Sequence, residues 1–315
     1  MRQLSRAAFE RAREFLKTQA RPLDPALFEY HFEQAPAESV LRELAHFQND
    51  DGGFGHALEP DMRAPTSSAL ATGIGLRLLR ELDCATDHPM VQRAIKYLLA
   101  TFDASTQVWR VIPADANAFP HAPWWHDDGA NWRGSLAQTF DGFRIIPRAE
   151  LVGLLHHYAA LVPPQWLNDI TESTVACIET VEKLGTGGGD DLHYAITLAE
   201  TAKLPERFKA RLAARIRAVT LDVVARDPQK WNSYCITPLK LASSPRSLVA
   251  DLLEDILPVN LDYQIEHQTA EGTWEPTWSW GNLYPDTWAQ AKLEWRGSLT
   301  LDALTTLRAF GRIAS

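Results

Sequence analysis

The chain has 315 residues, 45% of them hydrophobic, and a formal net charge of −9. This length allows a large buried core, and the negative charge argues against nucleic acid or an anionic membrane as a partner. No run of about 20 apolar residues is present, so we expect no transmembrane segment. The three cysteines are far apart, which argues against a disulfide framework and favours a reducing, cytoplasmic location.

The first elements along the chain are predicted to be helices. Residues 2–19 combine apolar and charged residues at helical spacing, which predicts an amphipathic helix. Residues 39–54, SVLRELAHFQNDDGGF, predict a helix that ends in a glycine-rich turn, and residues 66–82 predict the next helix. In the turn, glycine permits a positive φ, and Asp50 and Asp51 offer acceptors for backbone N–H groups. We therefore interpret this turn as a structural corner.

The same plan recurs further along the chain. Gln48 precedes Phe54 by six positions, and Gln268 precedes Trp274 by six positions, each pair following a predicted helix. Strand signals are nearly absent. The pattern therefore predicts an all-α chain of helical hairpins in series, as in a solenoid or a closed toroid. Less complete copies end at Trp109 and Trp231.

At these residues the chain resembles the terpenoid cyclase and protein prenyltransferase superfamily. Gln48 to Phe54 and Gln268 to Trp274 are similar to its QW motif, Gln-x2-3-Asp/Glu-Gly-x-Trp/Phe, which closes turns between outer and inner helices of an α/α barrel. HALEPD at residues 56–61 and YPxxWxxAKxEWRG at residues 284–297 resemble uncharacterised bacterial proteins of that superfamily.

The resemblance implies an α/α toroid of about five or six helical hairpins, forming a single domain over residues 1–315. Within it, Pro, Gly, Asn and Asp interrupt the helical periodicity over residues 119–146. We expect this segment to be an inserted loop.

In that superfamily the inner helices line a central cavity, and the residues after each turn lie near its mouth. The resemblance therefore implies a site there, with a carboxyl acid and aromatic walls that stabilise a cation. The catalytic candidates are Asp61, Asp127, Asp128, Asp190 and Asp191. The candidates for substrate binding are Glu59, His121, Trp124, Trp125, His126, His193, Tyr194, Tyr234, Trp278 and Trp280.

The first functional hypothesis is an isoprenoid-handling enzyme, terpene cyclase-like, that performs acid-initiated cyclisation or prenyl transfer in a central apolar cavity. The Asp-x-Asp-Asp string of such cyclases is absent, and helix-cap or turn roles are the alternative for the Asp pairs. Ser67, Ala71 and Gly75 are small residues at four-residue spacing. They either leave room for a bulky apolar ligand or let a neighbouring helix pack closely.

Two other classes remain open. The segment WEPTWSWGNLYPDTW, residues 274–288, places Glu275 and Asp286 among aromatic residues, which favours a carbohydrate-active α/α-barrel enzyme with paired carboxylates and a Trp platform. The third hypothesis is a non-catalytic binding protein that retains the barrel. No Gly-x-Ser-x-Gly, P-loop, dinucleotide or HExxH motif is present in the sequence.

We expect a small-molecule ligand, hydrophobic in character, and no cofactor. The alternative is a divalent metal ion at His121, His126 and Asp127. DDGAN, residues 127–131, is faintly similar to a DDxxD magnesium motif, but the second motif that accompanies it is absent from the sequence. The sequence does not predict an oligomeric state.

Overall fold

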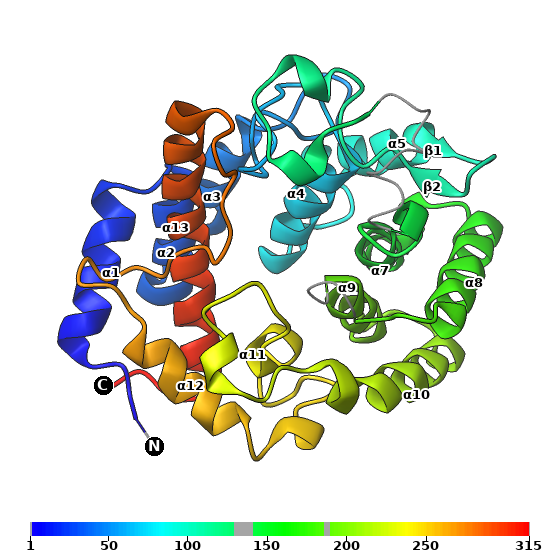
Figure 1. Ribbon diagram of the computed structural model, residues 1–315. Helices are drawn as coiled ribbons and strands as arrows, with labels where there is room; N and C mark the ends of the chain where they lie inside the picture. The colour runs from blue at the N-terminus through cyan, green and yellow to red at the C-terminus, as the bar shows by residue number, and fades with distance from the viewer. Residues whose placement is uncertain (1, 129–140, 186–189, 315) are drawn as a thin grey trace. The chain divides into compact units, whose positions relative to one another are not determined.

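The computed structural model describes residues 2–128, 141–185 and 190–314, which are predominantly α-helical (Figure 1). The all-α prediction is confirmed, and the strands in these ranges are limited to one short antiparallel pair. None of the helices in the described part of the chain is long and apolar enough to cross a membrane.

The α-helices are α1 (Arg6–Thr18), α2 (Leu23–Glu33), α3 (Ala37–Ala45), α4 (Ala69–Glu81), α5 (Pro89–Thr101), α7 (Arg148–His157), α8 (Pro164–Thr180), α9 (Asp190–Ala199), α10 (Glu206–Val223), α11 (Pro238–Leu241), α12 (Leu257–Glu266) and α13 (Pro285–Ala309). The strands are β1 (Phe102–Asp103) and β2 (Val108–Trp109), and the short 3-10 helices are η1 (Ala116–Ala118), η2 (Pro123–Trp125), η3 (Asp141–Phe143), η4 (Ala159–Leu161), η5 (Pro228–Lys230) and η6 (Asp251–Leu253).

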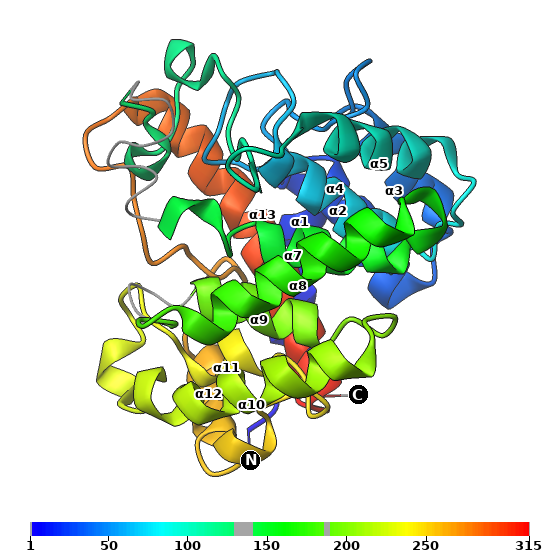
Figure 2. The same ribbon diagram turned by 90° about the vertical axis from the view of Figure 1, so that its right-hand side faces the viewer.

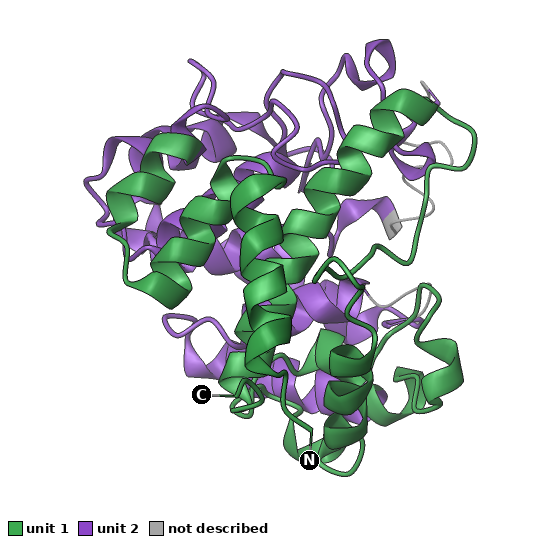
Figure 3. Ribbon diagram, turned by 90° about the vertical axis from the view of Figure 1, so that its left-hand side faces the viewer, with its two compact units in different colours: residues 1–43, 186–189, 220–315 green, residues 44–185, 190–219 purple. Residues whose placement is uncertain are grey.

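The chain divides into two compact units (Figure 3). Unit 1 comprises residues 1–43 and 220–315 with the short segment 186–189, and unit 2 comprises residues 44–185 and 190–219. The toroid and the single domain stay predictions. Much of the expected inserted loop lies outside the described residues, as does part of the DDGAN segment.

In unit 2, consecutive helices pack in two layers (Figures 1 and 2). Helix α7 packs between α4 and α9, while α5 packs on α4 and α8 packs on α7. His156 Nε2 on α7 lies 2.8 Å from Thr171 Oγ1 on α8. Arg211 on α10 binds both carboxylate oxygens of Glu179 on α8, at 2.9 and 2.6 Å. These contacts hold α4, α5, α7, α8, α9 and α10 together within unit 2.

In unit 1, α1, α2 and α13 pack on one another, and α11 packs on α12. The predicted N-terminal helix is α1, and its N-cap Ser5 accepts a hydrogen bond from the Ala8 N–H at 3.2 Å. The two ends of the chain pair: the Leu4 N–H donates to the Arg312 carbonyl at 2.7 Å, and the Ala314 N–H donates to the Leu4 carbonyl at 2.9 Å.

The turn after α3 is held by Gln48. Its Nε2 donates to the Gly52 carbonyl at 3.0 Å and to the Met90 carbonyl, in the first turn of α5, at 2.9 Å. The Arg93 guanidinium donates in turn to Gln48 Oε1. The aromatic residue that ends the turn, Phe54, is fully buried.

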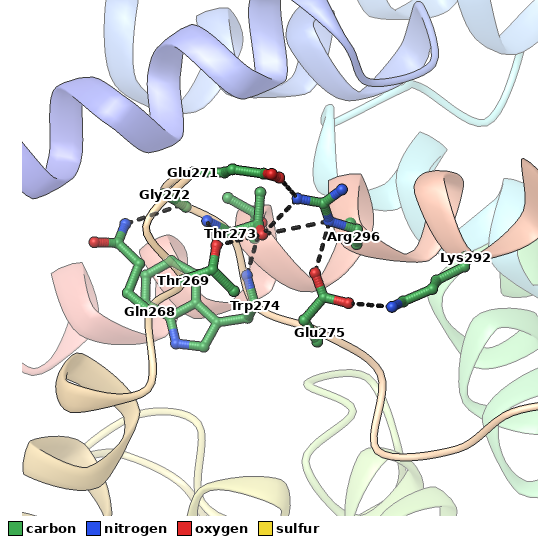
Figure 4. A network of polar contacts seen from close by, with 10 residues as sticks. Gln268, Thr269, Glu271, Gly272, Thr273, Trp274, Glu275, Lys292 and Arg296 are labelled. Carbon is green, nitrogen blue, oxygen red and sulfur yellow. Dashed lines mark hydrogen bonds and ion pairs between the residues drawn. The ribbon is translucent and has the colours of Figure 1, made fainter. Parts of the chain in front are cut away.

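The turn after α12 is built in the same way (Figure 4). Gln268 Nε2 donates to the Gly272 carbonyl at 3.0 Å and to the Ala8 carbonyl, in the first turn of α1, at 3.0 Å. Arg11 stands where Arg93 stands in the other turn, three residues beyond the accepting carbonyl, with its Nη2 3.5 Å from Gln268 Oε1. The Trp274 indole N–H donates to the Gln264 carbonyl at 2.7 Å, near the end of α12.

Each glutamine side chain thus donates one hydrogen bond to a carbonyl within its own turn and one to a carbonyl in the first turn of another helix. The structural-corner interpretation is confirmed for the turn at residues 48–55, and the turn at residues 268–274 has the same hydrogen bonds. Asp51 serves the first turn as predicted, since its Oδ1 accepts hydrogen bonds from the Gly53 N–H at 2.9 Å and from the Ser67 hydroxyl at 2.7 Å.

Two of the small residues predicted to face a ligand or a neighbour, Ser67 just before α4 and Gly75 within α4, contact the turn after α3. A Cβ added at Gly75 would lie 2.7 Å from the ring of Phe54, so the glycine accommodates the turn's aromatic side chain. The Ser67 hydroxyl also accepts a hydrogen bond from Asn49 Nδ2 at 2.9 Å. The element that occupies the space beside Ser67 and Gly75 is therefore the preceding turn, where the alternative predicted a neighbouring helix, and the ring of Phe54 leaves no room for an apolar ligand beside Gly75.

Replacing Gln48 or Gln268 by alanine is expected to lower the free energy of unfolding by about 1–3 kcal/mol, because each variant loses two part-buried hydrogen bonds to backbone carbonyls. Thermal and urea unfolding of both variants measures the effect. Gln92→Ala, at an exposed position of α5, is the control and is expected to change little. Unchanged stability of both turn variants would contradict the shared role of the two glutamines.

Candidate functional site

Two segments that sequence analysis proposed for the site lie side by side in unit 2. The Ala122 N–H donates to the Asp61 carbonyl at 2.8 Å, and Met62 and His121 form an antiparallel bridge. The side chains of Glu59, Asp61 and His121 are all buried. The expected convergence of these two segments is therefore seen within this unit.

The two histidines of the segment HAPWWHDD, His121 and His126, contact each other. His121 Nε2 lies 3.2 Å from His126 Nδ1, and the two rings stack with centroids 5.4 Å apart. The Asp127 carboxylate instead binds the Arg110 guanidinium at 2.8 Å. Within the described ranges, no three side chains among His, Cys, Asp and Glu are placed to hold a metal ion. Of the other candidates in this segment, Trp125 is buried, Trp124 is half-buried and Asp128 is exposed.

Asp191 stands in the first turn of α9, and its carboxylate binds backbone N–H groups there and before the helix. Its carboxylate accepts hydrogen bonds from the Gly185 N–H, at 3.1 and 3.2 Å, and from the Leu192 N–H at 2.8 Å. Burial raises the pKa of Asp191, although these two N–H groups oppose the shift. The helix-cap alternative accounts for Asp191. His193, two residues on, is exposed.

Four charged side chains act on the phenol of Tyr194 on α9, and with it we call them the Tyr194 cluster: Glu59, Arg77, Glu150, Asp190 and Tyr194. Arg77 Nη1 on α4 binds Glu150 Oε1 on α7 at 2.8 Å. Burial raises the pKa of Tyr194, the carboxylates of Glu150, Asp190 and Glu59 act in the same direction, and Arg77 opposes them. The phenol therefore stays protonated and is a hydrogen-bond donor at neutral pH.

Close packing of α4 on α7 positions Glu150. A Cβ added at Gly73 would lie 3.2 Å from a Leu151 methyl group and 3.6 Å from Glu150 Oε2. Glu150 is 4% exposed and stands in the first turn of α7, where the helix dipole favours a negative charge. Arg77 retains 42% of its side-chain exposure, so the cluster is open to solvent on the arginine side.

Sequence analysis missed Arg77 and Glu150. One signal for Glu150 was available in the sequence. It is the single acid in the otherwise apolar run AELVGLL, and an acid in a segment that is otherwise expected to be buried is uncommon unless it has a partner. A small pocket next to Glu59 is lined by Leu58, Ala71 and Ile112 and has room for about one water molecule, too little for a substrate.

Unit 1 holds a second buried carboxyl group that sequence analysis missed. Asp24 is 1% exposed; its Oδ1 accepts a hydrogen bond from Arg21 Nε at 3.3 Å, while its Oδ2 has no hydrogen-bond partner among the described residues. The glycine at position 297 makes room for this carboxyl, because a Cβ there would overlap Asp24 Oδ2. Burial raises the pKa of Asp24; the Arg21 guanidinium opposes this shift and the nearby Glu294 carboxylate adds to it.

A carboxyl group whose pKa is raised by folding binds more protons in the folded state, so stability falls as pH rises through the folded pKa. Asp24→Asn, which stays neutral, is therefore expected to gain stability relative to the wild type between pH 4 and pH 8. Urea unfolding at both pH values measures this difference, with the exposed Asp222→Asn as control. A difference that does not change with pH would show that Asp24 is charged in the folded protein.

The aromatic candidates near the C-terminus lie in unit 1. The rings of Tyr234 and Trp278 are 6.2 Å apart, and those of Trp278 and Trp295 are 5.1 Å apart, both edge-on. Trp280, which is 1% exposed, packs on Trp288 with centroids 5.6 Å apart. Their convergence with the candidates of unit 2 stays a prediction.

Glu275 is bound to two cations. It binds Lys292 Nζ at 2.7 Å and Arg296 Nε at 2.9 Å, and Arg296 also binds Glu271 (Figure 4). These ion pairs connect the turn after α12 to α13. Glu275 therefore has a structural role, and Asp286 stands in the first turn of α13.

The Tyr194 cluster combines acids, a cation and a phenol from α4, α7, α9 and the segment at Glu59. Comparison with protein-family models and with curated proteins finds no match for this chain.

Proposed function

We propose that the chain is an acid–base enzyme that acts on a neutral, hydroxyl-rich substrate of the carbohydrate class at the Tyr194 cluster. The observation that carries this proposal is the buried Glu150 on α7, ion-paired with Arg77 on α4 at 2.8 Å. Tyr194 on α9 supports it, because the carboxylates of Glu150, Asp190 and Glu59 all act to raise the pKa of its phenol. Binding a sugar needs several hydrogen-bonding groups, and hydrolysing a glycosidic bond needs a pair of carboxyl groups. In this proposal Arg77 and Tyr194 contribute hydrogen-bonding groups, and Glu59 and Glu150 are the pair of carboxyl groups.

The chemistry assigns each group a role. Glu59 and Glu150 are the two carboxyl groups, one donating a proton to the leaving oxygen and the other activating water or attacking. Arg77 holds Glu150 in place through their ion pair. The Tyr194 hydroxyl donates a hydrogen bond to the substrate.

An isoprenoid substrate is the second candidate. The edge-on tryptophans of unit 1, Trp278 and Trp295, support it, because aromatic faces stabilise a cation during cyclisation. The resemblance to the terpenoid cyclase superfamily supports it as well, and membership of that superfamily stays part of this proposal. The packing of Phe54 on Gly75 removes the earlier argument for an apolar cavity at that helix.

Calorimetry with a panel of neutral oligosaccharides and a farnesyl-chain lipid tests the substrate class. Sugar binding by the wild type, weakened about tenfold in Tyr194→Phe by the loss of one hydrogen bond, is the expected result. The matched control is Tyr30→Phe on α2, another half-buried tyrosine. Lipid binding without sugar binding would overturn the proposal in favour of the isoprenoid candidate. Sugar binding with no product formed would favour the non-catalytic binding protein.

A further inference from the structure

The imidazole rings of His121 and His126 bring two nitrogen atoms close together. Nε2 of His121 lies 3.2 Å from Nδ1 of His126. Two nitrogen ligands of one zinc ion, each about 2.0–2.1 Å from the metal at the tetrahedral angle, are about 3.3–3.4 Å apart. The observed distance between the two ring nitrogens is therefore close to that of two imidazole ligands sharing one tetrahedral metal ion.

The backbone fixes the tautomer of His121. Its Nδ1 lies 2.7 Å from the Phe119 carbonyl oxygen, which can only accept a hydrogen bond, so Nδ1 carries the proton. In the neutral imidazole, Nε2 then presents its lone pair toward His126. A metal-ligating histidine commonly has this arrangement, with the second ring nitrogen donating to a carbonyl or a carboxylate. His121 is 3% exposed, so packing also holds its ring in place.

His126 completes the pair from the solvent side. Opposite the lone pair of His121 Nε2, neutral His126 carries its proton on Nδ1 when no metal ion is bound. In the other tautomer the proton is on Nε2, so His126 presents a second lone pair from Nδ1 and the ring stays neutral. His126 is exposed, so an ion can reach the pair and water can occupy the remaining coordination positions.

Hydrogen bonds hold the segment that carries the two histidines. The Ala122 N–H donates to the Asp61 carbonyl at 2.8 Å. At the other end of the segment, the Asp127 N–H donates to Asn117 Oδ1 at 3.0 Å, and Asn117 Nδ2 donates to the Asp127 carbonyl. Ligands that are already held in position lower the entropic cost of binding an ion.

The carboxylate of Asp127, expected from the sequence as a third ligand, is bound by the Arg110 guanidinium at 2.8 Å. Within the ranges that the structure describes, no third His, Cys, Asp or Glu joins the pair, so water must fill the other positions. The donors are therefore two neutral imidazoles. They suit zinc, copper or nickel ions, whereas magnesium and calcium prefer oxygen ligands.

We propose that His121 and His126 form a metal site of unit 2, in which His121 Nε2 and His126 Nδ1 bind one divalent ion of the zinc, copper and nickel class and water completes the coordination. This two-imidazole site takes the place of the three-residue site that included Asp127. It does not depend on the reaction proposed at the Tyr194 cluster.

The first experiment titrates the metal-free full chain with Zn²⁺ by calorimetry. We expect the wild type to bind one ion that His126→Gln binds more than about tenfold more weakly, since loss of an outer partner of a ligand already costs roughly 10- to 100-fold in metal affinity. His46→Gln, at another exposed histidine, is the matched control and is expected to bind as the wild type does. A thermal melt checks that both variants are folded.

Absence of zinc binding by the wild type overturns the proposal. Zinc binding of unchanged affinity in folded His126→Gln also overturns it, because the ion is then held elsewhere in the chain.

The second experiment uses the wild type alone and follows the ring nitrogens of His121 and His126 by ¹⁵N NMR at mildly alkaline pH. On addition of Zn²⁺, the proton of His126 is expected to move from Nδ1 to Nε2, while that of His121 stays on Nδ1. A purely structural hydrogen bond between the two rings predicts no such change. A His126 ring that keeps its proton on Nδ1 in the presence of saturating Zn²⁺ overturns the assignment.

Discussion

Replacing Gly52 or Gly272 by alanine is expected to lower the free energy of unfolding by about 3–5 kcal/mol, the largest effect we expect from a single methyl group in this chain. Both glycines have a positive φ, 91° at Gly52 and 90° at Gly272. A Cβ at Gly52 would overlap the Arg93 carbonyl oxygen, and one at Gly272 would lie 2.5 Å from the Arg11 carbonyl carbon. Each variant therefore combines backbone strain with a collision against a helix backbone that cannot move aside.

The matched control separates these two contributions. Gly281 also has a positive φ, 62°, but a Cβ there would meet no atom within 4 Å. Gly281→Ala therefore reports backbone strain alone, and we expect it to cost about 1 kcal/mol. Urea unfolding of the three variants measures the difference. Equal losses at all three positions would show that close approach to the neighbouring helix contributes nothing.

Glu150→Gln is expected to reduce turnover of the substrate that the binding panel identifies by roughly 10²- to 10⁴-fold, the usual contribution of a general acid or base. The amide matches the carboxylate in shape but can neither hold nor accept the proton. Steady-state kinetics measures the loss, and a thermal melt confirms that the variant is folded.

The control for this variant is Glu182→Gln, at an exposed position shortly after α8, which is expected to retain full turnover. Glu59→Gln is expected to lose activity to a similar extent, because the proposed reaction needs both carboxyl groups. Full turnover in both folded variants would remove the Tyr194 cluster from the catalytic role. A loss in Glu59→Gln alone would leave Glu59 as the essential acid.

Local patterns in the sequence predicted the helical class and the two corners. The spacing of apolar residues predicted helices at α1, α4 and α12, and the glutamine, glycine and aromatic positions predicted the turns at Gln48 and Gln268. These features depend on residues within one or two helical turns of each other. The identities of residues that are close together in the chain are therefore enough to predict these helices and turns.

The sequence by itself therefore determined the helices, the turns and the residues that close them, because hydrogen bonding and periodicity act over short separations. Only the tertiary structure decided which charged groups meet. Arg77 pairs with Glu150 across 73 positions, and Gln48 reaches Met90 across 42. The roles of Ser67 and Gly75 were also decided there, since either packing or ligand binding satisfies the same small-residue pattern. Contacts of this kind depend on how helix faces pack against each other, and periodicity identifies a buried face without naming its neighbour.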